Sequence, residues 1–222
     1  MHIKIRVWDL PTRIFHWVLV LCVIGSIVTV NLGGNWMQWH FRFGYAILVL
    51  LFFRITWGFT GSRYARFNSF PASPRAALAY VRKQSHASAG HNPLGAFSVY
   101  LLLLVLLFQV VTGLFANDAI MWDGPLRHWV SNNTSDWFTT LHKANRFLLL
   151  ALITLHLLAI ACYTWVKKQA LVKAMWTGDK EFDDGQSRIP ARDNAKLRWG
   201  GLIVLGIYIA LVALFLGLAA LK

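Results

Sequence analysis

Five long apolar segments dominate the pattern of hydrophobic and polar positions along the chain. They cover about residues 14–32, 40–60, 94–116, 141–166 and 199–221. Each segment is continuously apolar, and each reaches the ~20 residues that a helix needs to cross the hydrocarbon core of a bilayer. Strands of a membrane barrel are about half as long and alternate in polarity, so helices are the expected spanning form. The pattern predicts an all-α integral membrane protein.

The composition agrees with this interpretation. Hydrophobic residues make up 57 % of the 222 positions, which is too apolar for an ordinary soluble domain. The first apolar segment is longer than the core of a signal peptide and has no small-residue cleavage site after it, so we expect it to stay in the protein. Cys22 and Cys162 lie inside apolar segments and are expected to be small packing residues, because a disulfide would require those two spans to touch.

Charge is distributed unevenly between alternate loops, within a net charge of +13. Lysine and arginine gather in the N-terminal arm and in the linkers 61–92 and 167–198, whereas residues 33–39 carry no charge and residues 117–140 are net acidic. The positive-inside rule therefore predicts a cytoplasmic N-terminus and a periplasmic C-terminus in a bacterial inner membrane. There is no basic stripe with interleaved aromatic residues, which argues against nucleic acid as a partner.

Half of the eight histidines lie in or at the ends of predicted spans: His16, His40, His142 and His156. Ionisable residues in a membrane are costly and are candidates for function by default. His142 and His156 are fourteen residues apart, which is close to four helical turns. They should therefore share one helix face at a separation of ~21 Å, too far for one metal ion but suited to two sites.

The predicted topology sorts these histidines into two levels. His40 and His142 open spans that enter from outside, whereas His16 and His156 lie ~25 Å and ~22 Å below the outer ends of their spans. Two axial imidazoles at each level match the needs of a low-spin b-type haem, and the absence of CxxCH excludes covalent c-type attachment. A two-metal centre is disfavoured because no span contains a carboxylate. The alternative is that these histidines are hydrogen-bonded packing residues.

Other residues in the spans could accommodate such cofactors. Four glycines could let a macrocycle or a helix approach closely: Gly25, Gly44, Gly58 and Gly113. Arg54 at the inner level, and Arg42 and Arg146 near the outer pair, could each pair with a haem propionate. For Arg42 and Arg146 the alternative is snorkelling of the guanidinium to the membrane surface.

Several short motifs together resemble the bacterial cytochrome b561 family. They are TRIFHW at the first span, RITWGF in the second, GHNPLG before the third, GLFANDAIMWDGPL after it, and the LHK…LH pattern of the fourth. The resemblance covers about residues 5–168, and its closest branch is the b-type cytochrome subunit of nickel–iron hydrogenases and stand-alone relatives. It implies a four-helix, di-haem transmembrane domain over residues 1–168, with the first-span histidine paired to the second histidine of span four. The linker 169–198 and the fifth span, in residues 199–222, depart from this four-helix pattern.

The resemblance also implies a quinone site beside the inner haem. His91, Asn92 and Gly95 could line it, with His86 as a weaker candidate. Histidine and asparagine can supply the hydrogen bonds and the proton path that a quinone ring needs. The alternative is that Asn92 caps a helix whose first residue is Pro93.

Two functions follow from these features. The first is electron transfer between a periplasmic redox partner, either a c-type cytochrome or a hydrogenase-like subunit, and the quinone pool. The second is a superoxide:quinone oxidoreductase that acts alone at the outer haem, so whether the chain is itself an enzyme stays open. A superoxide site needs a positively charged entrance that attracts the anion. The acidic loop 117–140 argues against such an entrance, whereas the nearby Arg42, Lys143 and Arg146 argue for it. A haem or metal transporter is disfavoured by paired axial ligands, which bind too firmly for exchange.

Overall fold

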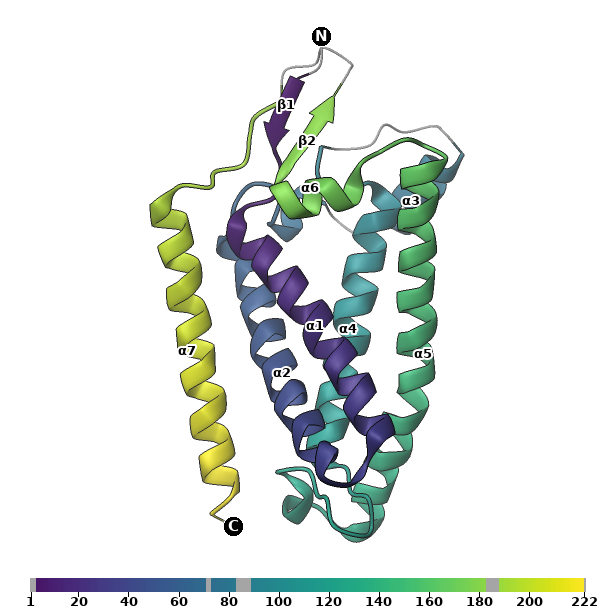
Figure 1. Ribbon diagram of the computed structural model, residues 1–222, viewed down its shortest axis with the longest axis vertical. Helices are drawn as coiled ribbons and strands as arrows, with labels where there is room; N and C mark the ends of the chain where they lie inside the picture. Colours follow the sequence, from purple (N-terminus) through teal and green to yellow (C-terminus); the bar gives the residue numbers. More distant parts are fainter. Residues whose placement is uncertain (1–2, 71–72, 83–88, 183–187, 222) are drawn as a thin grey trace. The chain divides into compact units, whose positions relative to one another are not determined.

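The structure is a computed structural model that describes residues 3–70, 73–82, 89–182 and 188–221. Within these ranges, five helices are long and apolar enough to cross a membrane (Figure 1). They are α1 (Leu10–Leu32), α2 (Met37–Thr60), α4 (Pro93–Phe115), α5 (Asn132–Trp165) and α7 (Ala195–Ala219). The predicted all-α membrane protein with five spans is confirmed.

Several helices begin before the apolar segments do, most of all α5, because their first turns include polar residues. Helix α5 begins at Asn132, nine residues before the expected start at 141, with the sequence NNTSDWFTT. The hydroxyl of Ser131 accepts a hydrogen bond from the backbone N–H of Thr134 at 3.2 Å, which satisfies one free donor of this first turn. Helix α1 likewise starts at Leu10 rather than 14. Apolar length predicts the part of a helix that lies in lipid and omits such polar extensions.

Shorter elements occupy the linkers. Along the chain, the linkers between the long helices contain two short helices, α3 (Pro74–Val81) and α6 (Leu171–Thr177). They also contain three 3₁₀ turns, at Gly34–Trp36, Phe67–Ser69 and Arg127–Trp129. Strand β1 (Ile3–Arg6) pairs antiparallel with β2 (Asp179–Phe182), and Ile3 lies opposite Phe182 (Figure 1). The sequence analysis did not predict this pair, because strands of four residues show too little alternation to be recognised.

The chain forms two compact units. The first comprises Met1–His16, Arg54–Leu102 and Ile153–Val204, and the second comprises Trp17–Phe53, Leu103–Leu152 and Leu205–Lys222. His16 and His156 belong to the first unit, and His40 and His142 belong to the second. Each predicted histidine pair therefore falls within one unit.

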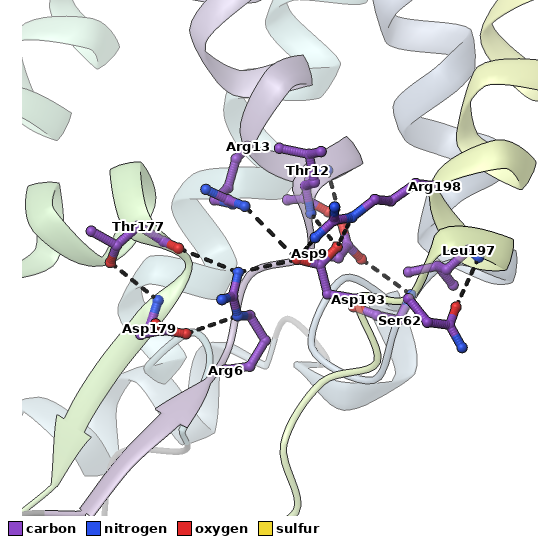
Figure 2. A network of polar contacts seen from close by, with 12 residues as sticks. Arg6, Asp9, Thr12, Arg13, Ser62, Thr177, Asp179, Asp193, Leu197 and Arg198 are labelled. Carbon is purple, nitrogen blue, oxygen red and sulfur yellow. Dashed lines mark hydrogen bonds and ion pairs between the residues drawn. The ribbon is translucent and has the colours of Figure 1, made fainter.

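Asp9 organises the start of α1 in the first unit. Its carboxylate is completely buried and accepts hydrogen bonds from the backbone N–H of Thr12 at 2.7 Å and of Ser62 at 3.3 Å (Figure 2). The indole N–H of Trp57 is a third donor, at 3.2 Å from Oδ2. Asp9 thus caps α1 and also links it to the end of α2, and the three donors compensate for burying a charge.

Asp193 forms a second polar centre just before α7 (Figure 2). It makes ion pairs with Arg6 and Arg198, each at 3.0 Å, and accepts the backbone N–H of Leu10 at 3.1 Å. The second turn of α7 also approaches α1 closely, since a Cβ atom at Gly201 would lie 2.9 Å from the Pro11 ring. These contacts attach the base of α7 to the N-terminal arm.

The Asp193 centre should make stability depend on pH. Burial raises the pKa of Asp193, but hydrogen bonds from Arg198 and Leu10 and the charges of Arg198 and Arg6 outweigh it, so the net pKa is lowered. A lowered native pKa means that the stabilisation is complete above the unfolded value near ~4 and is lost as the pH falls through the native pKa. We expect Asp193→Asn to unfold several degrees below wild type at pH 7, and the difference to shrink below about pH 4.

Thermal unfolding of the detergent-solubilised protein across this pH range measures the effect. Asp123→Asn is the matched control, because Asp123 is exposed in the loop between α4 and α5, which the loop charges predict to be an outer loop. A difference that is the same at every pH would show that the carboxylate charge is not its source.

Candidate functional site

His40 on α2 and His142 on α5 line one cavity of about 350 Å³ in the second unit. Their ring centroids are 6.2 Å apart, and the two ring planes are perpendicular. Ligand cavities in proteins commonly measure ~300–1,000 Å³ and are mostly apolar with a few convergent polar groups. The structure thus brings together the two histidines that the sequence analysis assigned to the outer level.

Both imidazoles are held at Nδ1 by backbone carbonyls. The Nδ1 of His40 lies 3.0 Å from the carbonyl oxygen of Ser26, and the Nδ1 of His142 lies 2.9 Å from that of Gln109. A carbonyl only accepts hydrogen bonds, so each Nδ1 carries the proton and each Nε2 keeps its lone pair. This tautomer, with the far nitrogen bonded to a carbonyl, is the usual arrangement of a histidine that ligates a metal.

The spacing of the two rings suits one metal ion between them. Metal–imidazole bonds of ~2 Å on opposite sides of an ion would place the two ring centroids ~6 Å apart, close to the observed separation. Nε2 of His142 also contacts the amide nitrogen of Gln109 at 3.2 Å, which a bond to iron would replace. Among the described residues no group of three or more His, Cys, Asp or Glu side chains could hold a metal. Two imidazoles alone would not complete the coordination of an iron ion, and a porphyrin would supply the remaining donors, so this donor set fits a haem.

Two of the four glycines singled out in the spans lie at the cavity, and the other two pack against phenylalanine rings elsewhere. Gly44 lines the cavity one turn after His40, and a Cβ atom there would meet nothing within 4 Å. A Cβ atom at Gly113 would lie 2.9 Å from the His142 ring, so this glycine lets α4 approach the imidazole. The other two glycines pack on phenylalanine rings, Gly25 on Phe43 and Gly58 on Phe67.

The two arginines near the outer pair are placed differently. Arg146 lines the cavity together with Lys143, and its guanidinium lies 4.8 Å from the Phe147 ring centroid. Arg42 is exposed, lies 4.7 Å over the Trp39 ring and is not among the residues that line this cavity. Arg146 therefore has the better position for an anionic group bound in the cavity.

In the first unit, His16 and His156 lie close enough to interact electrostatically. Arg54 of the same unit is only 3 % exposed, and its guanidinium lies 4.8 Å over the Phe67 ring. Its Nη1 atom is buried and has no hydrogen-bond partner among the described residues. A buried cation with an unsatisfied donor is costly, and a carboxylate such as a haem propionate would satisfy it.

The residues of the GHNPLG stretch are embedded in the first unit. His91 lies between the rings of Trp8 and Phe70, at centroid distances of 4.7 and 4.3 Å. Burial and the nearby charge of Arg54 lower the pKa of His91 to about 3, so the imidazole is neutral at physiological pH. His86, the weaker candidate, lies outside the described residues.

Asn92 uses both of its side-chain groups. Its Oδ1 accepts the backbone N–H of Gly95 at 2.7 Å, which caps α4, and its Nδ2 donates to the hydroxyl of Tyr163 at 2.8 Å. The helix-capping role that was left open as an alternative is thus present in the structure. The side chain of Asn92 could bind a ligand only if that ligand replaced one of these two hydrogen bonds.

The sequence did not predict the polar partners of these groups. Ser26 contacts His40, and Gln109 and Thr112 contact His142, with Asn145 bonded to Gln109. Tyr163 contacts Asn92 and is itself bonded to Tyr80 and covered by Lys167. A signal was available for Gln109 and Asn145, because uncharged polar residues are uncommon in apolar spans and usually have a partner there.

Residues 7–178 match the family described as prokaryotic cytochrome b561, and the chain belongs to this family. The resemblance noted in the sequence is therefore confirmed. As a member of this family it is a multi-pass membrane protein of the b-type cytochromes, which carry haem b and transfer electrons. Helix α7 lies beyond the matched residues.

Curated relatives agree with the family. A probable Ni/Fe-hydrogenase B-type cytochrome subunit of Rhizobium leguminosarum bv. viciae is 25 % identical over 217 aligned positions, which cover 82 % of this chain and 90 % of the relative. A protein of the same description from Rhodobacter capsulatus is 24 % identical, with 82 % and 83 % covered. The probable Ni/Fe-hydrogenase 1 B-type cytochrome subunit of Escherichia coli K12 is 27 % identical over 48 % of this chain and 57 % of the relative. No solved structure matches the chain.

Proposed function

We propose that this protein is a di-haem b-type cytochrome that carries electrons across the bacterial inner membrane between a periplasmic redox partner and the quinone pool. The observation that carries the proposal is the His40–His142 pair, with both Nδ1 atoms on carbonyls, both rings on one cavity and 6.2 Å between centroids. The location of His16 and His156 together in the other unit supports a second haem. The loop charges support a cytoplasmic N-terminus and a periplasmic C-terminus.

The side chains have distinct roles in this proposal. His40 and His142 hold the outer haem, His16 and His156 hold the inner haem, and propionates pair with arginine. For the inner haem the partner is Arg54, whereas Arg146 and, with less support from its position, Arg42 serve the outer one. Bound haem supplies a one-electron couple, and the chain sets the ligand tautomer and provides an apolar surround.

Quinone would bind near the GHNPLG stretch, beside His91, Asn92 and Gly95. A hydrogen-bonded chain of side chains supports this location: Asn92 donates to Tyr163, and the Tyr163 hydroxyl contacts that of Tyr80 at 3.1 Å. The ammonium of Lys167 lies 4.3 Å over the Tyr163 ring. Such a chain could deliver protons to a quinone from the cytoplasmic side.

The relatives' descriptions favour a hydrogenase-like subunit as the periplasmic partner, with a c-type cytochrome as the other candidate. The outer loop that follows α4 would meet it. Asp118 accepts backbone N–H bonds from Ile120, Met121 and Trp122, at 2.8–2.9 Å, and leaves Ile120 90 % exposed. A loop tip held in this way offers a defined surface for docking.

One observation favours the second candidate, a superoxide:quinone oxidoreductase. Lys143 and Arg146 both line the cavity that contains His40 and His142, and cations there would attract a small anion. Superoxide-dependent reduction of the purified cytochrome would support this activity. If superoxide does not reduce the protein but quinol does, the superoxide activity is eliminated and electron transfer to a partner is the function that stands.

The proposed function is tested on protein purified in detergent after haem-replete expression. We expect about two haems b per chain by pyridine haemochrome assay, since each pair of axial histidines binds one, and reduction of both by an added quinol. A haem content near zero would contradict the whole proposal. Two haems that no quinol can reduce would contradict only the quinone part.

Arg54 provides a prediction about the inner haem. Replacing it by methionine should weaken retention of that haem by about 10- to 100-fold, because a hydrogen bond to a charged group is lost. The rate of haem transfer to an excess of apomyoglobin measures the loss. Arg63→Met is the matched control, since Arg63 is exposed in the same unit. If Arg54 has no anionic ligand, the substitution should instead leave haem retention unchanged, because no bond to the haem is lost.

A further inference from the structure

A pair of polar side chains joins α4 to α5 in the second unit. It consists of Gln109 on α4 and Asn145 on α5, and Asn145 is only 8 % exposed. Unsatisfied polar groups inside a membrane span cost several kcal/mol, so such side chains need complete hydrogen bonding. The proposed function uses the backbone carbonyl of Gln109 but neither side chain.

The hydrogen bonds of this pair have one consistent direction. The amide nitrogen of Asn145 lies 3.1 Å from the Val105 carbonyl and 2.7 Å from Oε1 of Gln109. The Val105 carbonyl can only accept a hydrogen bond, so the Asn145 atom that faces it is the amide nitrogen. Because this nitrogen is a donor, the Gln109 atom that faces it is the amide oxygen. The amide nitrogen of Gln109 is therefore turned away from Asn145.

Gln109 consequently contacts His142 at three atoms. Its amide nitrogen lies 3.1 Å from the carbonyl oxygen of His142 and 3.2 Å from Nε2, and its backbone carbonyl accepts from Nδ1 at 2.9 Å. The backbone carbonyl fixes the tautomer of the imidazole, and the side-chain amide holds the backbone of His142 against α4. A bond from iron would replace the contact at Nε2, whereas the contacts at Nδ1 and at the carbonyl are compatible with ligation.

We propose that Gln109 and Asn145 are positioning residues for the outer haem: Asn145 orients the Gln109 amide, and that amide holds the backbone of His142 so that its imidazole keeps Nε2 toward the cavity. The inference rests on the proposed function, in which His142 is an axial ligand. Loss of an outer-shell partner typically weakens metal binding by about 10- to 100-fold. A purely structural role, in which the pair only joins α4 to α5, predicts instead a general loss of stability without selective loss of one haem.

The test compares Gln109→Met and Asn145→Leu with wild type in the full-length protein. Asn31→Leu is the matched control, because Asn31 is in α1 of the same unit and its amide nitrogen donates to the carbonyl of Ile27 in its own helix. We expect both variants to lose one haem about 10- to 100-fold faster to apomyoglobin, to retain the other, and to change the low-spin electron paramagnetic resonance signal of the weakened haem. The double variant should be no weaker than Gln109→Met, since Asn145 acts through Gln109.

Three outcomes would overturn the inference. The first is wild-type haem retention and spectrum in both variants, the second is equal weakening of both haems, and the third is additive effects in the double variant. Should Asn145→Leu fail to fold, Asn145→Ala removes the same donor without adding bulk. The haem content of the wild-type protein is measured before any variant is compared. A wild-type content other than about two haems per chain would contradict the proposed function itself.

Discussion

Replacing His142 by alanine is expected to lower the haem content of the purified protein from about two per chain to about one. His142 and His40 are the only imidazoles among the residues that line the cavity of the second unit. Alanine supplies no ligand, and the remaining imidazole alone cannot hold a six-coordinate low-spin iron. His16→Ala should remove the other haem, since His16 and His156 lie in the first unit.

The pyridine haemochrome assay, with dithionite-reduced spectra of each variant, measures both losses. His128→Ala is the matched control, because His128 is exposed in the outer loop and is not among the predicted ligands. A His142→Ala protein that retains both haems with unchanged spectra would eliminate His142 as an axial ligand. Loss of both haems in each variant, in protein that remains folded, would show that the two sites are not independent.

The second large effect is expected for Asp9→Ala, which should destabilise the protein by about 3–8 kcal/mol. The substitution removes the cap of α1, worth about 0.5–2 kcal/mol. It also leaves the indole N–H of Trp57 and the backbone N–H of Ser62 without their acceptor in a buried position, at about 1–3 kcal/mol each. Both donors contact Asp9 at 3.2–3.3 Å, and Asp9 and Trp57 are almost completely buried.

Equilibrium unfolding in mixed micelles, followed by tryptophan fluorescence, gives the free energy of unfolding for each variant. Asp123→Ala, in the exposed outer loop, serves as the control for loss of a carboxylate. A difference below about 1 kcal/mol for Asp9→Ala would mean that water or another group takes over its hydrogen bonds.

The sequence was sufficient to predict the membrane spans and the family. A span needs ~20 continuous apolar residues whatever its neighbours are, so hydropathy alone located α1, α2, α4, α5 and α7. The sorting of His40 with His142, and of His16 with His156, also followed from helix rise and loop charge. Both arguments are local, because they depend on the geometry of single helices and on the bilayer.

The partners of these residues were decided only by the tertiary structure. The carbonyl of Ser26 accepts a hydrogen bond from Nδ1 of His40, 14 positions away, and that of Gln109 accepts one from Nδ1 of His142, 33 positions away. Asp193 is 187 positions from its partner Arg6. No periodicity relates residues on different helices, since which faces meet depends on how side chains of both helices pack. The same holds for the β1–β2 pair and for Arg54 against Phe67. The sequence by itself thus determined which helices are long and apolar enough to cross the membrane, and it predicted how the histidines pair. The tertiary structure alone decided which groups orient them, because hydrogen bonds between helices depend on packing that local sequence does not specify.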